Sequence, residues 1–196
     1  MTTTVRGEKV PATRRILDAT RALVARGGAA EVSIGHIADA ADVSKALVHY
    51  HFRDKDSLLQ ALVEDVGVGV VARAAAFLDA SDAGNTGNVL DNYWEWLATE
   101  LEEGDIRILL ALAEYDSARV RSAARRVADQ RRDLSASHVE HVFARLSLTP
   151  RVPAPLIAQT VLAFVDGLAA TTPTAAAREP RPAFDVLWLA LLTLAE

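Results

Sequence analysis

Side chains that can donate and accept hydrogen bonds are concentrated between positions 44 and 51, which read Ser-Lys-Ala-Leu-Val-His-Tyr-His. The hydroxyl, ammonium, phenol and imidazole groups of this segment can bond to base edges or to phosphate oxygens. Leu47 is apolar and is expected to face inward. A short helix with one such polar face would suit the groove of a nucleic acid.

Two short helices are predicted to hold this polar face in place. Ser33 is a suitable N-cap for a helix that ends near Ala41 and Asp42. Ser44 is a suitable N-cap for a second helix that ends near His51. The turn between them is Ala-Ala-Asp-Val, and the residues expected to pack the pair together are Ile34, Ile37, Ala38, Val43 and Leu47. This arrangement is typical of a helix-turn-helix.

A more specific pattern lies between Thr13 and Glu64. It consists of Ser33-Ile34-x-x-Ile37-Ala38-x-x-Ala41-Asp42-Val43-Ser44 and then Tyr50-His51-Phe52-x-x-Lys55-Asp56-x-Leu58. The pattern resembles the TetR family of transcriptional regulators. That family usually has glycine where Asp42 stands, and aspartate adopts a left-handed backbone at lower cost than most residues. We therefore expect the turn to be kept.

The resemblance implies a role for each polar residue of this segment. Base edges in the major groove would be contacted by Lys45, Ala46 and His49. Phosphate groups would be contacted by Ser33, Ser44, Tyr50, His51 and Lys55. Phe52 is expected in the core. His49 and His51 could begin a metal site, but no third ligand is placed to complete it, so no metal is expected.

The composition excludes several classes of protein. The chain has no cysteine, so disulfides, thiolate zinc sites, iron–sulfur clusters and cysteine nucleophiles are excluded. Its 196 residues are 51% hydrophobic and 24% charged, with 10 glycines and 7 prolines, which excludes disordered and fibrous classes. No cofactor motif is present, and no cofactor is expected.

The charge is unevenly distributed along the chain. The net charge is −5, which taken alone would argue against a nucleic acid partner. Residues 1–56, however, carry nine Lys or Arg and seven Asp or Glu, a net charge of +2, whereas the remaining residues carry −7. Several arginines between positions 119 and 132 could form a second basic surface. Neighbouring acids such as Asp129 and Asp133 favour a solvated, ion-paired face instead.

Helical spacing of apolar residues predicts an all-α fold of about nine helices. An N-terminal three-helix helix-turn-helix head, residues 1–56, is joined by a long fourth helix to a larger helical domain for ligand binding and dimerisation, residues 57–196. The predicted helices lie near 11–27, 34–41, 44–51, 55–80, 88–102, 105–115, 117–146, 155–171 and 181–195, with a clear loop at 81–87. Gly67 and Gly69, inside the fourth helix, predict either a bend or a close helix contact.

The fifth predicted helix is the first candidate for a ligand pocket. Tyr93, Trp94 and Trp96 lie within four positions and cannot all face one core, so at least one should line a cavity. The resemblance implies that helices five to eight enclose an effector pocket. The residues predicted to line it are Trp94, Trp96, Leu97, Leu109, Ala113, Tyr115, His138 and His141.

The last two predicted helices are apolar on nearly every side. A helix of this kind has to be buried, and a second copy of the same chain would cover it economically. The residues predicted at this homodimer interface are Leu156, Gln159, Leu162, Val165, Phe184, Leu187, Trp188 and Leu191.

Together these features predict a ligand-responsive transcriptional repressor rather than an enzyme. Its homodimer would bind a palindromic operator on double-stranded DNA and be released by a small-molecule effector. One alternative is a helical module whose basic head binds a protein or an anionic surface. The other is an all-helical enzyme using His138 or His141 with Asp116 or Glu140, although it lacks a nucleophile motif.

The hydrophobic pattern predicts a soluble, cytoplasmic protein with no membrane partner. The longest clean apolar run, residues 186–195, is about half the length that a bilayer requires. Residues 1–15 contain no hydrophobic signal core.

Overall fold

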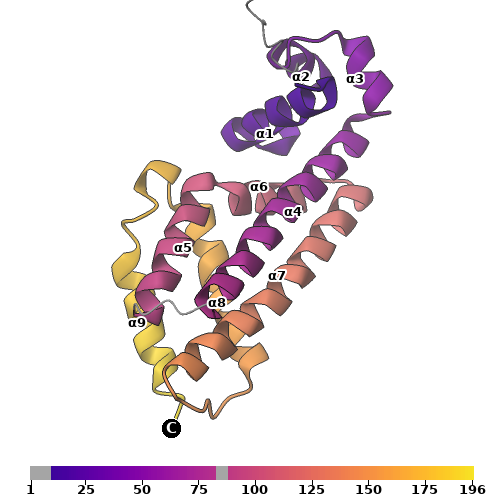
Figure 1. The fold of residues 1–196 in the computed structure, drawn as a ribbon. Helices are drawn as coiled ribbons and strands as arrows, with labels where there is room; N and C mark the ends of the chain where they lie inside the picture. The colour runs from indigo at the N-terminus through magenta and orange to yellow at the C-terminus, as the bar shows by residue number, and fades with distance from the viewer. Residues whose placement is uncertain (1–9, 83–87) are drawn as a thin grey trace, which may run out of the picture.

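The chain folds into an assembly of α-helices (Figure 1). The structure, a computed structural model, describes residues 10–82 and 88–196. These two ranges contain nine α-helices and one short 3-10 helix, and no strand, which confirms the predicted all-α class. The helices are α1 (Ala12–Glu31), α2 (Ile34–Ala40), α3 (Lys45–His51), α4 (Lys55–Asp82), α5 (Val89–Glu103), α6 (Asp105–Ala113), α7 (Ala118–Arg145), α8 (Ala154–Thr171), η1 (Thr174–Ala176) and α9 (Arg181–Leu192).

A small head and a larger body are joined by one long helix (Figure 1). Helices α1, α2 and α3 form the head, and α4 runs from the head into the body. Helix α7 lies beside α4 over much of its length, while α5, α6, α8 and α9 complete the body. This is the predicted order of elements.

Helices α4 and α7 are in close contact at Gly67. A Cβ atom there would lie 2.5 Å from Cγ2 of Val127, well inside the contact distance of two carbon atoms. Helix α4 is one continuous helix across this point. Of the two explanations predicted for these glycines, a close helix contact therefore applies to Gly67, whereas Gly69 faces the side chain of Arg73.

Some helix ends differ from the prediction. Helix α1 has its break at Gly28, where φ is +78°, as expected, but helical hydrogen bonding resumes as far as Glu31. Helix α9 ends at Leu192 rather than near Ala195, because the backbone of Glu196 pairs with that of Thr149 through two hydrogen bonds of 2.9 and 3.1 Å. Helix α4 extends two residues into the predicted loop 81–87, and positions 83–87 of that loop lie outside the described residues.

Candidate functional site

The helix-turn-helix begins with two serine caps that hold the first turns of α2 and α3. The hydroxyl oxygen of Ser33 accepts a hydrogen bond from the backbone N–H of His36 (3.2 Å). Ser44 accepts one from Leu47 in the same way (3.1 Å). Each cap satisfies one of the free amide groups at a helix start. Both predicted caps are confirmed.

The turn between α2 and α3 depends on Asp42. Its φ of +51° is left-handed, as predicted for an aspartate at the family's usual glycine position. The guanidinium of Arg15, on α1, donates a hydrogen bond to the Asp42 carbonyl oxygen (3.3 Å). Helix α1 therefore supports the turn that sets the direction of α3.

Helix α3 has one buried side and one open side. Val48 is fully buried and anchors the helix to the head, while Leu47 is only half-buried. The prediction that Leu47 is the inward residue is therefore wrong in part, because the neighbouring position lies more centrally on the inner side of so short a helix. Lys45, Ala46, His49 and Tyr50 are exposed, with 82% of Tyr50 accessible.

Lys45 extends from α3 toward the start of α2. A Cβ atom added to Gly35 would lie 3.3 Å from Nζ of Lys45 and 3.6 Å from Oγ of Ser33. The ammonium and the hydroxyl are thus close together beside the free amides at the N-terminus of α2. These groups have the chemistry that binds an anion such as a phosphate.

The other predicted phosphate contacts are partly engaged within the protein. Nδ1 of His51 lies 3.3 Å from Oγ1 of Thr13, within hydrogen-bonding distance. Lys55 donates to the carbonyl oxygen of Ala30 (3.1 Å), and its Nζ lies 5.1 Å from the centre of the Tyr115 ring. Its partial burial lowers its pKa. Lys55 therefore fastens the end of α1 to the junction of head and body.

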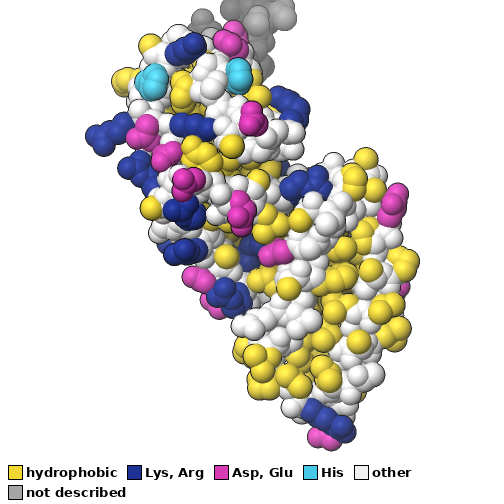
Figure 2. Space-filling view, turned by 180° about the vertical axis from the view of Figure 1, so that it is seen from behind, with side chains coloured by type: hydrophobic (Ala, Val, Ile, Leu, Met, Phe, Trp, Pro, Cys, Tyr) yellow, Lys and Arg dark blue, Asp and Glu magenta, His cyan; other side chains and the backbone are white. Residues whose placement is uncertain are grey.

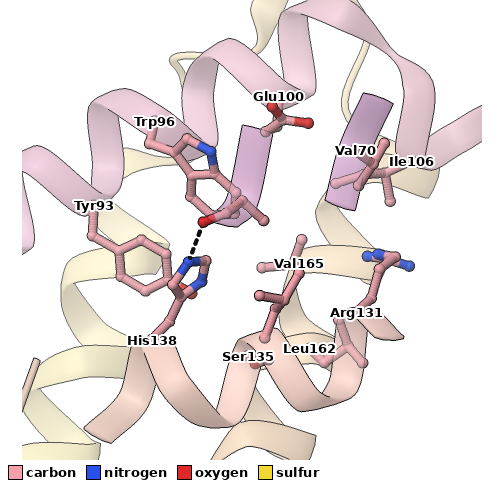
Figure 3. A pocket seen from close by; sticks show the side chains of 12 residues that line it. Val70, Tyr93, Trp96, Glu100, Ile106, Arg131, Ser135, His138, Leu162 and Val165 are labelled. Carbon is pink, nitrogen blue, oxygen red and sulfur yellow. Dashed lines mark hydrogen bonds between the residues drawn. The ribbon is translucent and has the colours of Figure 1, made fainter. Parts of the chain in front are cut away.

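Helices α4 to α8 enclose a cavity in the body (Figure 3). Water-sized molecules can occupy about 40 Å³ of it, which is room for only a few waters. Of the predicted pocket residues, Trp96 and His138 line this cavity. The full lining is Val70, Ala74, Tyr93, Trp96, Glu100, Ile106, Arg131, Leu134, Ser135, His138, Leu162 and Val165.

Glu100 and Arg131 belong to the cavity but were absent from the predicted lining. The signal was present in the helical spacing, since Tyr93, Trp96 and Glu100 follow each other at intervals of three and four residues on α5. Arg131 stands seven residues before His138 on α7, two turns earlier on the same side. Charged side chains are seldom fully buried, so their type alone favours a surface position.

His138 is buried and neutral at physiological pH. Burial, which disfavours the charged imidazolium, lowers its pKa to about 4. Its Nε2–H donates to the backbone carbonyl oxygen of Ala74 (3.0 Å), shown as the dashed line in Figure 3. The rings of Phe77, Tyr93 and Trp96 pack around the imidazole with centroid distances of 5.0 to 5.5 Å.

A second space lies between α6, α7 and α8, with about 60 Å³ open to water-sized molecules. Its lining contains the predicted residues Leu109 and Ala113, and also Arg131, which borders both spaces. A 2.5 Å ion pair joins Arg131 to Asp166 on α8.

The remaining predicted pocket residues line neither space. Trp94 packs on Phe184 with a centroid distance of 5.3 Å, and Leu97 is fully enclosed in the core. Tyr115 lies at the head–body junction, where its hydroxyl donates to Asp56 (3.4 Å). His141, one turn beyond His138, is half-buried outside both linings. Helical spacing shows the face of each residue but not which part of that face stays unfilled.

A chain of ion pairs connects the cavity to the head. Arg73 of α4 holds the carboxylate of Glu100 through two nitrogen atoms (2.5 and 2.9 Å). The same guanidinium reaches Asp105, the first residue of α6 (3.0 Å). Arg21 of α1 pairs with the other oxygen of Asp105 (2.7 Å) and lies 3.6 Å from Glu103.

The outer side of α8 and α9 is an exposed apolar surface (Figure 2). The predicted interface residues Leu156 and Gln159 are exposed on it, and Leu162 and Leu187 are half-buried. Large apolar residues that the prediction omitted are also exposed here: Val186, Leu189 and Leu194.

Four predicted interface residues are core residues of the single chain instead. Val165, Phe184, Trp188 and Leu191 are buried within the chain. Trp188, for example, is completely enclosed and meets Tyr93 at a ring distance of 5.6 Å. The prediction was wrong because an apolar helix can be covered by its own chain on one side and by a partner on the other.

Four arginines of α7 are ion-paired on the surface, as the charge pattern of the sequence favours. Their partners lie on α4 or α7, or just before the start of these helices: Arg119 with Asp54, Arg126 with Glu64, Arg121 with Asp116 and Arg132 with Asp129. Among the described residues, no group of three His, Asp or Glu side chains could hold a metal ion.

One described helix, α8, is long and apolar enough to cross a membrane by length and composition alone. Gln159 and Asp166 interrupt its apolar run. Its inner side packs against α7.

Comparisons with known proteins found one family model and several similar folds. Residues 16–62 match the model of the tetR family of bacterial regulatory proteins, and no curated protein sequence matches the chain. The fold resembles the reduced form of NemR from E. coli (18% identity, TM-score 0.72, 94% of this chain and 98% of that one). It also resembles a transcriptional regulator from Rhodococcus sp. Rha1 (20% identity, TM-score 0.73, 94% and 98%). A third match is FadR from Bacillus subtilis in complex with stearoyl-CoA (14% identity, TM-score 0.64, 89% and 96%).

The TM-scores and coverages show a fold shared over nearly the whole chain. The family model covers the helix-turn-helix itself. Residues 16–62 therefore match the tetR family of bacterial regulatory proteins, and the chain as a whole shares the fold of these solved regulators.

Proposed function

We propose that the chain is a cytoplasmic, ligand-responsive repressor that binds a palindromic operator as a homodimer. One observation carries the DNA-binding part of this proposal. Helix α3 is anchored through buried Val48 and leaves Ala46, His49 and Tyr50 open to solvent. A short, firmly seated helix with an open polar side can enter the major groove.

We assign the base contacts to Ala46 and His49 and keep Lys45 as a contact that can serve either bases or phosphates. Its position beside Ser33 favours a phosphate, because both groups and the amides of α2 would share one anion. Ser44, Tyr50, His51 and Lys55 would contact the flanking backbone. Residues 1–56 would thus read DNA, and residues 57–196 would bind the ligand and form the dimer.

The exposed apolar surface of α8 and α9 supports the dimer. Val186 and Leu189 are each 67% exposed, and burying such side chains contributes roughly 1.5 to 3 kcal/mol apiece. Two-fold pairing of this surface would present the two α3 helices to successive major grooves, roughly 34 to 36 Å apart or a multiple of that spacing.

The cavity between α4 and α8 supports an effector site. Its lining is mostly apolar and aromatic, with a few polar groups, which is the usual composition of a small-molecule site. The similar FadR structure holds stearoyl-CoA, a far larger molecule than this cavity admits. We propose a small effector whose binding favours a separation of the heads that no longer fits the operator.

The enzyme alternative receives no support from the position of His138. The imidazole donates to a backbone carbonyl oxygen and is surrounded by aromatic rings, whereas Asp116 is fully exposed just before the start of α7. An acid–base pair requires the two groups within hydrogen-bond reach of one substrate.

Selection of bound fragments from genomic DNA, followed by hydroxyl-radical footprinting, tests the proposal. We expect an inverted repeat and two protected major grooves on one face of the duplex. Lys45→Ala should weaken the binding of operator DNA and of scrambled DNA by the same factor. The slope of log affinity against log salt concentration should fall by the amount expected for about one phosphate contact. A chain that retains no DNA, or that protects a single asymmetric site, would refute the proposed function.

A further inference from the structure

Glu100 places a buried negative charge at the wall of the cavity. Its side chain is 1% exposed, and that of Asp105, which shares Arg73, is 4% exposed. The guanidinium groups that balance them lie farther out, with Arg73 35% and Arg21 31% exposed. Charges near solvent are screened more strongly than buried charges, so the carboxylates dominate the potential at this end of the cavity.

The opposite side of the cavity is locally neutral. Arg131 is the other charged residue in the lining, and it is paired with Asp166 at 2.5 Å. The ion pairs around the cavity contain three guanidinium groups and four carboxylates. The guanidinium groups belong to Arg21, Arg73 and Arg131, and the carboxylates belong to Glu100, Glu103, Asp105 and Asp166. One added positive charge would balance the set.

Aromatic rings form one side of the same cavity (Figure 3). Tyr93 and Trp96 stack at 5.5 Å, and Phe77 stacks on both, at 5.9 and 5.3 Å. His138 beside them is neutral, since its pKa is lowered to about 4, and adds no positive charge. Aromatic faces attract cations, and the attraction grows when the cation is removed from water.

We propose that the cavity takes a small organic cation, and that Glu100 both recognises this cation and transmits its arrival to α1. The proposal rests on the proposed function, since it names the effector class and the route of regulation. A cation beside Glu100 competes with Arg73 for the carboxylate. Arg73 then bonds more strongly to Asp105, which weakens the hold of Asp105 on Arg21 of the head.

Three probes of nearly equal size, each small enough for a space of a few waters, test the charge class directly: ethylammonium, ethanol and acetate. Calorimetric titration of the full-length protein at pH 7 should show ethylammonium binding at least tenfold more tightly than the other two. Equal binding of the three, a preference for acetate, or no binding of ethylammonium would overturn the proposal. This comparison uses the unchanged protein and does not depend on any variant folding.

Glu100→Gln should abolish the preference for ethylammonium while keeping the binding of ethanol. Glu95→Gln is the matched control, because Glu95 lies on the same helix but forms a surface pair with Arg178. If Glu100→Gln keeps the preference, Glu100 is not the recognition residue and the proposal fails.

The route to the head is tested by operator binding. Ethylammonium should lower the operator affinity of the wild-type protein at least fivefold. Arg21→Gln should still bind ethylammonium but lose this response, and a full response would refute the route through Arg21. If the protein bound no DNA at all, the proposed function would fail while calorimetry would still decide the charge class.

Discussion

Gly67 of α4 lies directly against Val127 of α7, and an added Cβ atom would come within 2.5 Å of the valine side chain. Gly67→Ala should therefore destabilise the protein by about 1 to 3 kcal/mol, the usual cost of overpacking a core. Urea unfolding measures this difference. Gly69→Ala is the matched control, because its Cβ would meet one guanidinium nitrogen of Arg73 at 3.1 Å, a much milder overlap than the 2.5 Å at Gly67. If both variants have equal stability, the close contact is not what requires glycine at position 67.

The left-handed turn at Asp42 gives a second prediction. Asp42→Val should lower the free energy of unfolding by about 1 to 2 kcal/mol, because a branched side chain is poorly tolerated at a φ of +51°. Asp42→Gly should stay within about 0.5 kcal/mol of the wild type, since the carboxylate is exposed and its pair with Arg15 is long (4.0 Å). Asp39→Val, at an exposed position of α2, provides the control in the same urea measurement. If Asp42→Val leaves the free energy of unfolding unchanged, the left-handed turn does not constrain the residue at position 42.

His138 should make stability depend on pH. Its folded pKa of about 4 lies below the usual value of 6.5, so the unfolded chain binds the proton more readily. Stability from this group is complete above pH 6.5 and is lost as the pH falls from 6.5 toward 4, by up to roughly 1.4 kcal/mol per pH unit.

His138→Gln should remove this part of the pH dependence, while His36→Gln, at an exposed position, should leave it unchanged. The comparison is made by urea unfolding at pH 7 and at pH 4.5. If the free energy of unfolding changes equally between pH 7 and pH 4.5 in the wild type and in His138→Gln, the result would contradict the burial of a neutral imidazole.

The dimer surface can be separated from the core beneath it. Val186→Glu combined with Leu189→Glu should leave the chain folded but monomeric in sedimentation, and should abolish tight operator binding. Val68→Glu, on an exposed part of α4, should keep the dimer. Trp188→Ala should instead cost about 3 to 5 kcal/mol of stability, because the indole is fully enclosed. If the variant with both glutamates is still a folded dimer, the interface lies elsewhere.

Local features of the head could be predicted because they depend on neighbouring residues in the sequence. Ser33 and Ser44 cap their own helices, and the left-handed turn at Asp42 follows from two adjacent short helices. The assignments in the body depend on distant packing. The apolar pattern of α9 does not reveal that Trp188 is covered by its own chain while Leu189 is not.

The burial of the charged cavity residues also depends on distant packing. Glu100 is buried only because Arg73, on another helix, meets its carboxylate with two nitrogen atoms. Burial of a charge requires such a partner, and the sequence of α5 alone does not reveal it. A search for charged residues in register with Trp96 and His138 would have found both Glu100 and Arg131.

The central claim is that α3 reads bases, and the affinity of His49→Ala for DNA tests it most directly. Fluorescence anisotropy would compare the selected operator with a scrambled duplex at one fixed salt concentration. The wild-type protein should prefer the operator by at least about a thousandfold. His49→Ala should lose roughly 1 to 3 kcal/mol of that preference without changing its affinity for scrambled DNA. An equal loss on both duplexes, or a wild-type protein with no preference, would contradict the claim.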